Sequence, residues 1–271
     1  MTQTASETGT ATPAAAGELA ADRRVFRITG ADRESFLQGL VTNDLRKLAA
    51  GPVYAAFLTA QGKYLADFLL VPDLVPDGEA ILLDIKDSIA DAFVRRLSMY
   101  RLRADVQIAA TGLKVWRGLG PAPVAAVPDP RDARLGWRLY TEAEGHRAAE
   151  PIDWDAIRVA ACIPETGIEL IPDDTYILEA GFERLNGVDF RKGCYVGQEV
   201  TARMKHKTEL RKGFRTVQVE GAAPVGTEIL AGGKPAGKLF TQSGGQGIAF
   251  LRLDRAQGEM LAGEARVRLA D

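Results

Sequence analysis

The sequence predicts an α+β protein that ends in a small β-barrel, and three patterns along the chain carry this prediction. Residues 24–109 read as strand, helix, three strands, helix and strand, an order that mixes hairpins with packed helices and does not suit a doubly wound sheet. Residues 114–162 again read as strands followed by a helix. From Gly213 onward, short apolar strands alternate with glycines at a spacing typical of a small barrel or sandwich.

The first segment begins with a strand over 24–28, where apolar and charged residues alternate. A helix is expected shortly afterwards, with Asp32 as its cap. The buried stripe of this helix is expected to consist of Phe36, Leu37, Leu40 and Val41. Two strand-like runs, 53–58 and 64–71, flank a polar link that contains glycine, and they predict a hairpin.

A strand over 80–85 leads to a second helix, for which Asp87 and Ser88 are good capping residues. Apolar residues then recur at the three- and four-residue spacing of one helical face, namely Ile89, Phe93, Leu97 and Tyr100. A strand over 105–109 closes the first segment.

The second segment is predicted to hold strands around Val115 and over 137–140, then a helix from Asp153 to Cys162 that Pro164 ends. With 271 residues the chain is too long for one ordinary core, because domains usually hold roughly 100–200 residues. It is expected to divide into a flexible tail, two α+β domains and a barrel, with bounds 1–20, 21–112, 113–208 and 209–271.

Composition excludes several classes of protein. The chain holds 34 Lys and Arg against 36 Asp and Glu, so no overall field draws it onto nucleic acid or membrane. Two cysteines cannot form a disulfide framework or a typical zinc site, and no apolar run approaches the roughly 18 residues of a membrane helix. Residues 1–20 lack Lys, Arg and any hydrophobic block, which argues against a secretory or transit signal. A cytoplasmic protein without a membrane partner is expected.

The most informative stretch surrounds Cys194, which Gly193 and Gly197 bracket with backbone that few other residues could replace. A helix over 198–205 should follow, with Glu199 and Arg203 on one face. A thiol at a helix N-terminus beside Lys192 can have a lowered pKa, which makes Cys194 a candidate reactive or metal-touching group. The alternative is a small buried apolar side chain.

The motif Lys192-Gly193-Cys194-Tyr195-Val196-Gly197-Gln198-Glu199, with Arg203, closely resembles the hallmark of the YgfZ folate-binding family. Similarity extends to residues 36–44, 60–63 and 163–168. The resemblance implies relationship to the mitochondrial iron–sulfur assembly factor and to the glycine-cleavage T protein. It also implies a fold of ferredoxin-like α+β segments around a central folate site, followed by a C-terminal β-barrel.

The resemblance implies tetrahydrofolate or a derivative as the cofactor. The pterin edge offers N–H donors to a carboxylate, the ring suits aromatic walls and the glutamate tail suits cations. Glu179 is similar to the T protein's pterin-reading glutamate, Trp154 matches a tryptophan near folate, and Asn43 belongs to a motif that faces the ligand. Arg203 completes the expected folate set. The alternatives are a solvated acid for Glu179 and core packing for Trp154.

One departure bears on enzymatic activity. Where the T protein carries two consecutive aspartates, this sequence reads Ala66-Asp67. Loss of the first member argues against glycine cleavage, because proton transfer needs precise hydrogen-bond geometry that a shifted Asp67 does not guarantee. The sequence therefore leaves enzymatic activity open and favours a protein without it.

The leading expectation is a tetrahydrofolate-binding accessory factor for assembly or repair of iron–sulfur clusters in cluster-dependent enzymes, including tRNA-modifying ones. A thiolate suits iron, but one cysteine cannot hold a cluster, so assembly proteins or client enzymes are the expected partners and no intrinsic metal site is expected. One alternative is a folate-dependent aminomethyl or one-carbon transferase that uses Asp67 and Glu179. Another is a tRNA-binding modification helper that uses the basic segment 191–215. Aromatic residues are sparse in this segment, which argues against direct binding of nucleic acid.

Overall fold

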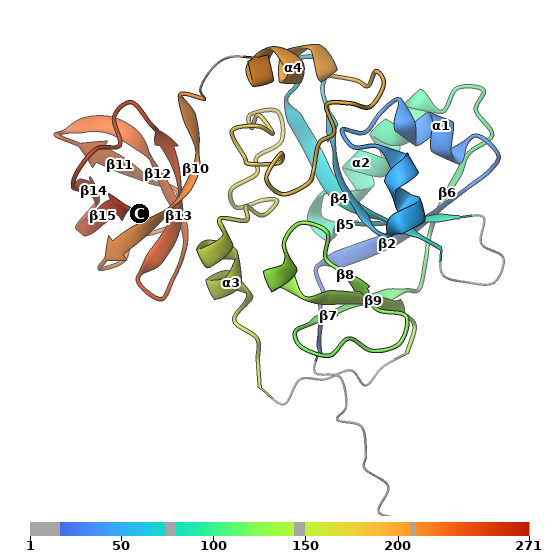
Figure 1. Ribbon diagram of the computed structural model, residues 1–271, viewed down its shortest axis with the longest axis horizontal. Coiled ribbons are helices and arrows are strands. Elements are labelled where there is room, and N and C mark those ends of the chain that lie inside the picture. Colours follow the sequence, from blue (N-terminus) through green and yellow to red (C-terminus); the bar gives the residue numbers. More distant parts are fainter. Residues whose placement is uncertain (1–16, 74–79, 144–149, 207–209, 271) are drawn as a thin grey trace, which may run out of the picture.

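The computed structural model describes residues 17–73, 80–143, 150–206 and 210–270. It contains two antiparallel sheets, four α-helices and a closed barrel within these residues. Figure 1 shows the barrel on one side, the larger α/β body on the other, and the irregular chain of residues 163–197 running between them. The expected α+β class with a C-terminal barrel is confirmed.

The larger sheet has five strands in the order β3-β4-β5-β2-β6, and all of its neighbours are antiparallel. Its strands are β2 (Arg23–Thr29), β3 (Val53–Leu58), β4 (Tyr64–Pro72), β5 (Ile81–Lys86) and β6 (Gln107–Ala110). β3 and β4 are nearly continuous apolar runs because both faces of the sheet are buried. The expected hairpin between these two strands is confirmed.

One face of this sheet is covered by α1 (Arg33–Gln38) and α2 (Asp87–Tyr100). Phe57 and Phe68 point to this face and meet Phe93 of α2, with ring centroids 5.7 and 5.0 Å apart. Alternate residues of the same strands, such as Tyr54 and Tyr64, point to the other face and join the central core. Phe93 and Leu97 of the predicted helical face therefore pack on the sheet, whereas Tyr100 at the end of that face is 41% exposed.

Asp32 occupies the N-cap position of α1, but its side chain makes no capping hydrogen bond there. Its carboxylate accepts instead from the backbone N–H of Asp105 at 2.8 Å, so it joins α1 to the approach of β6. Two short 3-10 helices, η1 (Leu45–Ala50) and η2 (Ala133–Leu135), complete the connections.

The smaller sheet corrects the expected flexible tail. Its order is β1-β7-β9-β8, formed by β1 (Gly17–Leu19), β7 (Lys114–Gly118), β8 (Val127–Pro128) and β9 (Trp137–Thr141). β1 pairs antiparallel with β7, so residues 17–19 form a strand ahead of the one expected at 24–28. Residues 17–20 are ordered because they pair with the open edge of β7. This partner lies about a hundred positions later in the sequence. Residues 1–16 of the expected tail lie outside the described residues.

Helix α3 (Trp154–Ala161) agrees with its prediction at both ends. The Asp153 carboxylate accepts from the backbone N–H of Ala156 at 2.8 Å, and Cys162 adopts the left-handed conformation that ends many helices. Helix α4 (Gln198–His206) also forms where the sequence predicts it.

The barrel is closed by six strands in the order β10-β13-β12-β11-β14-β15. They are β10 (Lys212–Glu220), β11 (Thr227–Ala231), β12 (Lys234–Ser243), β13 (Gln246–Arg252), β14 (Met260–Ala262) and β15 (Ala265–Leu269). Closure removes the exposed edges that an open sheet would present. Helix α3 packs against β10, β12 and β13 and thereby joins the barrel to the body.

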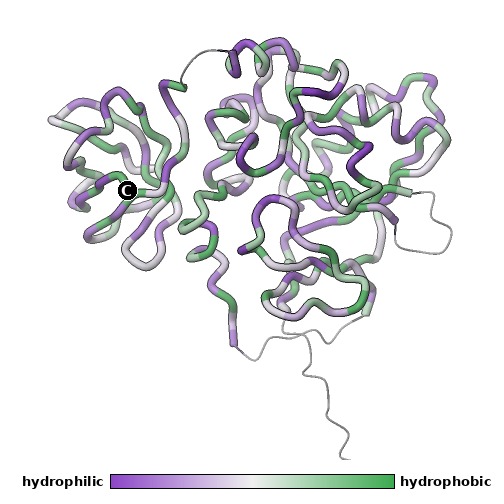
Figure 2. Tube along the Cα trace, viewed as in Figure 1, coloured by the Kyte–Doolittle hydropathy of each residue, from purple (hydrophilic) through white to green (hydrophobic). Residues whose placement is uncertain are grey.

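The hydrophobic cores cross the expected domain bounds. The central core collects Val25, Tyr54, Val115, Phe182 and Phe214, which come from every expected domain. Figure 2 shows hydrophobic residues, in green, along strands in the middle of the body and along the strands of the barrel. The region 113–208 therefore shares a hydrophobic core with its neighbours.

No helix within the described residues combines the length and the apolar character needed to cross a lipid bilayer.

Candidate functional site

A cavity of about 550 Å³ lies where the barrel meets the central chain. The chain from Glu169 to Glu179, Lys63 at the tip of the β3–β4 hairpin, and strands β10, β12 and β13 form its walls. Its volume falls within the range of about 300–1,000 Å³ that is usual for small-molecule sites.

Glu179 is the sequence-predicted residue that this cavity contains. Its backbone carbonyl accepts from the N–H of Phe214 at 2.9 Å, so the first barrel strand fixes its position. Burial raises the pKa of Glu179, while the nearby Lys212 and Lys63 oppose that rise. Among the described residues, no side chain donates to its carboxylate or forms an ion pair with it. The half-buried carboxylate is therefore available to a ligand.

A second acid of the cavity, Glu169, is committed to the protein. Arg158 of α3 donates to its Oε2 at 3.2 Å, and the hydroxyl of Thr241 donates to its Oε1 at 2.5 Å. Its carboxylate joins α3 to the barrel. Of the two other acids that line the cavity, Asp174 is exposed and Glu179 is half-buried, so Glu179 is the acid that faces a ligand inside the cavity.

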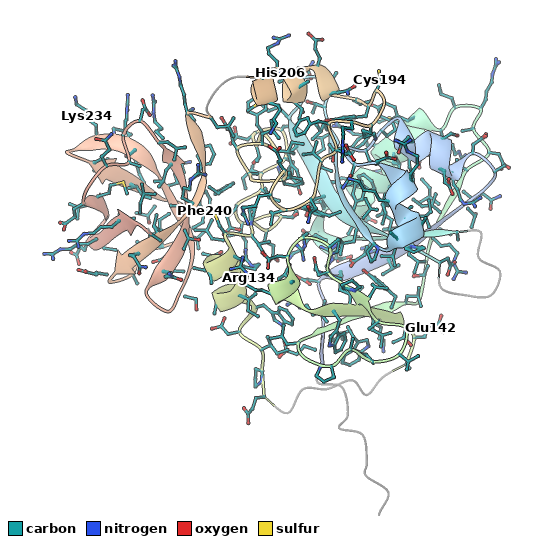
Figure 3. The ribbon with its side chains drawn as sticks, in the orientation of Figure 1. Arg134, Glu142, Cys194, His206, Lys234 and Phe240 are labelled. Atoms are coloured by element: carbon teal, nitrogen blue, oxygen red, sulfur yellow. The ribbon has the colours of Figure 1, made fainter. Side chains whose placement is uncertain are left out.

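Aromatic rings from the barrel face the central chain across this cavity. Phe214 makes edge contacts with Phe240 and Phe250, at centroid distances of 5.7 and 5.2 Å. All three pack against the central core and not inside the barrel. In Figure 3, Phe240 lies between the barrel and the body. The cavity thus has an apolar wall suited to a flat ring.

Cations surround the acid and the rings. Lys63, Lys212, Lys238 and Arg252 all line the cavity. The Lys63 ammonium lies 3.8 Å from the centroid of the Tyr176 ring and donates to the carbonyl of Asp174. The Glu179 carboxylate, an aromatic wall and several cations match the three parts of a folate, namely its pterin edge, its ring system and its anionic tail.

Sequence reasoning missed the aromatic residues and most of the cations. Phe240 follows buried Leu239 and lies opposite it on β12, so it belongs to the outer face of the barrel. An aromatic residue on the face where polar residues are expected is a signal that something covers that face. That alternation, read in Lys238-Leu239-Phe240, could have identified the cavity wall.

Trp154 does not line this cavity. It is 8% exposed, its indole N–H donates to Glu18 at 2.7 Å, and the Arg117 guanidinium lies 4.2 Å from its ring centroid. The Arg117 guanidinium thus covers the Trp154 ring, and the environment of this residue agrees with the alternative of core packing.

Asn43 is also fully engaged inside the protein. Its amide donates to the carbonyls of Tyr54 and Asn186 at 2.8 and 2.6 Å, and its oxygen accepts from Lys47 and from the N–H of Asp44. It anchors the chain before η1 and has no group left for a ligand. Asp44 caps the start of η1, because its carboxylate accepts from the N–H of Arg46 at 3.0 Å.

Asp67 lies on the central core face of β4, away from the residues of the Glu179 cavity. It is 5% exposed and accepts from the hydroxyls of Tyr54 at 3.0 Å, Tyr64 at 2.7 Å and Thr166. Ala66, the position of the missing aspartate, is 1% exposed and belongs to the opposite face of the sheet. The structure therefore brings no acid to the position that the resemblance marks for proton transfer.

Cys194 is exposed at the surface, ahead of α4. Figure 3 shows it at the outer edge of the molecule beside this helix, away from Phe240. It is not among the residues that line the Glu179 cavity, so the thiol and the candidate ligand site are separate features. The exposed thiol can be reached by a partner, which the alternative of a buried apolar side chain would not allow.

The sequence places Lys192 beside the thiol, but the structure directs its ammonium into the protein. Lys192 is 4% exposed, and its ammonium donates to the carbonyls of Gln38 and Asn43 at 2.7 and 3.0 Å and to that of Val41. Burial lowers the pKa of Lys192 to about 8, although the charges of Asp44 and Asp189 oppose this shift. The turn after α1 leaves carbonyls that need donors, and this need draws the side chain inward.

The other motif residues hold the loop in place. Tyr195 is buried, which raises its pKa to about 12, and Gln198 opens α4. Glu199 and Arg203 form the expected i,i+4 ion pair at 2.6 Å on an exposed face of α4, and Arg203 does not reach the Glu179 cavity. Of the four expected folate residues, only Glu179 lies at the cavity.

Only one of the two glycines beside Cys194 is required by the backbone. Gly197 has a φ of +83°, and a Cβ placed there would lie 2.5 Å from the carbonyl oxygen of Thr59. Gly193 has an ordinary φ, and an added Cβ would meet no atom within 4 Å. The expectation that both glycines are irreplaceable is therefore wrong for Gly193.

We expect Gly197→Ala to lower the free energy of unfolding by about 1–3 kcal/mol, because alanine is strained at this φ and meets the hairpin. Gly193→Ala is the matched control and should stay within about 0.5 kcal/mol of the unchanged protein. Urea denaturation of both variants measures the difference. Equal midpoints for the two variants would show that the hairpin does not hold this loop.

Among the described residues, no His, Cys, Asp or Glu side chains are grouped so that they could hold a metal ion. His206 lies at the end of α4, and His146 lies outside the described residues.

Comparison with known families and structures agrees with this architecture. Residues 211–271 match the model of the C-terminal β-barrel domain of CAF17. A glycine cleavage system aminomethyltransferase T from Bartonella henselae has the same fold, with a TM-score of 0.73 over 95% of this chain and 86% of that protein. The two sequences are 14% identical, so this similarity establishes the fold alone. The expected T-protein-like fold is confirmed.

Relatives of known name cover most of the chain. The mitochondrial iron–sulfur cluster assembly factor IBA57 of Mus musculus is 32% identical over 88% of this chain and 78% of its own length. The Homo sapiens protein of the same name is 33% identical over the same shares of both chains. These relatives contradict the expected cytoplasmic location, because they are mitochondrial. That expectation rested on the composition of residues 1–20, which does not determine the compartment of a protein. The extent of this similarity shows that the chain belongs to the IBA57 family of iron–sulfur cluster assembly factors.

Proposed function

We propose that this protein is a tetrahydrofolate-binding accessory factor for the assembly or repair of iron–sulfur clusters. The observation that carries the folate part is the unpaired, half-buried Glu179 in a cavity with phenylalanine rings and a cationic lining. The names of its relatives support the assembly part.

The lining residues fit the groups of a reduced folate. The Glu179 carboxylate would accept two adjacent N–H donors of the pterin edge. Phe240 and its neighbouring rings would contact the flat body, and the cations would hold the carboxylates of the tail. When bound, tetrahydrofolate would supply a reduced ring with amine nitrogens at the junction between barrel and body.

An accessory role is favoured over aminomethyl transfer. Asp67 is enclosed by two tyrosines and Thr166, and the position beside it is occupied by the apolar Ala66. A general acid or base must reach the reacting group within hydrogen-bond distance, and neither residue lines the cavity of Glu179.

Direct binding of tRNA through segment 191–215 receives little support from the geometry. The Lys192 ammonium is turned into the protein, Arg203 pairs with Glu199, and Lys205 pairs with Glu183. These contacts leave fewer free cations for phosphates than the sequence alone indicates.

We expect Glu179→Gln to weaken tetrahydrofolate binding by about 10- to 100-fold, because hydrogen bonds to a charged group contribute about 1.5–3 kcal/mol. Glu183→Gln is the matched control, since Glu183 is an exposed acid that pairs with Lys205 and does not line the cavity. Calorimetric titration of both variants with tetrahydrofolate measures the change. Equal affinity in the two variants would move pterin recognition away from Glu179.

A further inference from the structure

A second hollow, of about 350 Å³, lies against helix α2. Its floor is apolar and includes Phe57 and Phe93, which are 0% and 5% exposed. Arg95, Arg96 and Met99 of α2 form one side of it. We call this feature the α2 groove. It is separate from the Glu179 cavity and adjoins it, because Pro172 and Asp173 line the groove while the flanking Ile171 and Asp174 line the cavity.

Large apolar side chains are exposed beside the groove. Met99 is 67% exposed, Tyr100 41% and Leu102 90%, all within four consecutive residues at the end of α2. The Tyr100 ring contacts the edge of Phe57 at a centroid distance of 5.6 Å, so the exposed patch continues into the floor. Single exposed apolar residues are ordinary, whereas Met99 lines the hollow and Tyr100 contacts its floor, an arrangement typical of an interaction site.

The same end of α2 is strongly basic. Residues 92–104 contain four arginines and no acidic residue, in a chain of net charge −2. Arg95, Arg96 and Arg103 are exposed, and no carboxylate of the described residues forms an ion pair with them. The other end of the helix differs, because Asp87 and Asp91 there both pair with Arg24. The arginines at the groove are thus left without partners within the described chain.

We propose that the α2 groove docks an acidic, amphipathic segment of a partner protein. The apolar side chains of that segment would enter the hollow over Phe57 and Phe93, and its carboxylates would meet Arg95 and Arg96. Arginine is well suited to this role because its planar group binds carboxylates in pairs. Of the lining residues, Asp173 carries negative charge, and its place opposite α2 would orient the partner's acids toward the arginines.

The shape of the groove favours a protein segment over nucleic acid or a lipid surface. The phosphates of a nucleic acid would bind the arginines, but nothing would fill the apolar α2 groove. A bilayer surface is bound by a convex apolar face, whereas the apolar floor here lies in a depression that accepts individual side chains. An amphipathic helix with an acidic face would fill the groove with its apolar side chains and pair its carboxylates with the arginines.

The test uses the full chain and a fluorescein-labelled synthetic helix with leucines on one face and glutamates on the other. Anisotropy should show binding of this peptide and no binding of a version with lysine in place of glutamate. The double variant R95E/R96E should weaken binding at least tenfold, and Met99→Glu should also weaken it. These side chains are exposed or lie at the rim, so the fold should be retained.

Arg211→Glu is the matched control, because Arg211 is an exposed arginine before the barrel that does not line the groove. It should leave peptide affinity unchanged. Absence of binding by the acidic peptide, or equal loss with the control variant, would overturn the proposal. Binding of a single-stranded RNA or of anionic lipid vesicles that depends on Arg95 and Arg96, without binding of the acidic peptide, would also overturn it. None of these measurements involves folate or cluster assembly, so they are independent of the proposed function.

Discussion

Replacing Cys194 with serine is expected to abolish the support that this protein gives to cluster-dependent enzymes, while the fold and the folate affinity stay unchanged. The side chain is exposed ahead of α4 and takes no part in the hydrophobic cores. Thiolates are soft ligands for iron, whereas a serine hydroxyl of similar size is not. The exchange therefore removes the chemistry and preserves the shape.

The measurement is the activity of a cluster-dependent enzyme in cells whose own copy of this protein has been deleted and replaced by the variant. We expect Cys194→Ser to give the activity of the deletion. Cys162→Ser is the matched control, because Cys162 is the other cysteine, is half-buried at the end of α3, and has a pKa that burial raises. Full activity with Cys194→Ser would refute a role for the thiol.

A single exposed cysteine also implies that other ligands come from outside this chain. Clusters are usually held by four protein ligands. Cys194 does not line the Glu179 cavity, so the proposed folate site and the thiol lie at different surfaces of the molecule. Loss of one function should therefore be possible without loss of the other, and measuring folate affinity in Cys194→Ser tests this directly.

Helices and hairpins could be predicted from the sequence because their signals are local. Phe93 and Leu97 repeat at helical spacing, and Asp153 caps α3 from the preceding position. Strand β1 could not be predicted in this way. Its three residues carry no periodic signal, and they become ordered only because β7 offers a partner far along the chain.

The residues of the candidate site also divide into those that local sequence signals predict and those that depend on the fold. Glu179 could be found because its sequence neighbours resemble a known motif. For Phe240, strand alternation indicates an outward-facing aromatic residue that something covers, but the sequence does not tell which segment covers it or that Phe214 and Phe250 lie beside it. For Lys192, the sequence position is misleading. Its sequence position suggests a neighbour of the thiol, whereas the unsatisfied carbonyls after α1 decide where its ammonium lies.

Asp84→Asn is expected to have the largest effect on stability, because Asp84 is the centre of a buried charge network. Its carboxylate is 0% exposed and accepts from Arg23 at 2.6 Å and from Arg138 and Tyr140 at 2.9 Å. Arg138 also donates to Asp129 at 2.8 Å. The network joins β2 and β5 of the larger sheet to β9 of the smaller one.

Burial alone would raise the pKa of Asp84, but the charges of Arg23 and Arg138 outweigh it and lower the pKa. A carboxyl with a lowered folded-state pKa stabilises the protein above the pKa of the unfolded chain, about 3.9, and this contribution is lost as the pH falls. The asparagine variant removes the negative charge at every pH. It should therefore be less stable at neutral pH and lose less additional stability on acidification.

We expect Asp84→Asn to lower the free energy of unfolding by about 3–5 kcal/mol at neutral pH, because it leaves Arg23 and Arg138 buried without their shared acid. Asp91→Asn is the matched control. Asp91 pairs with Arg24 at the surface, where an ion pair contributes at most about 1 kcal/mol. Urea denaturation at neutral pH and at pH values below about 3.9, where the contribution of Asp84 is lost, measures both variants. If the two variants lose the same stability, the arginines must find other partners, and the junction between the sheets would depend on apolar packing alone.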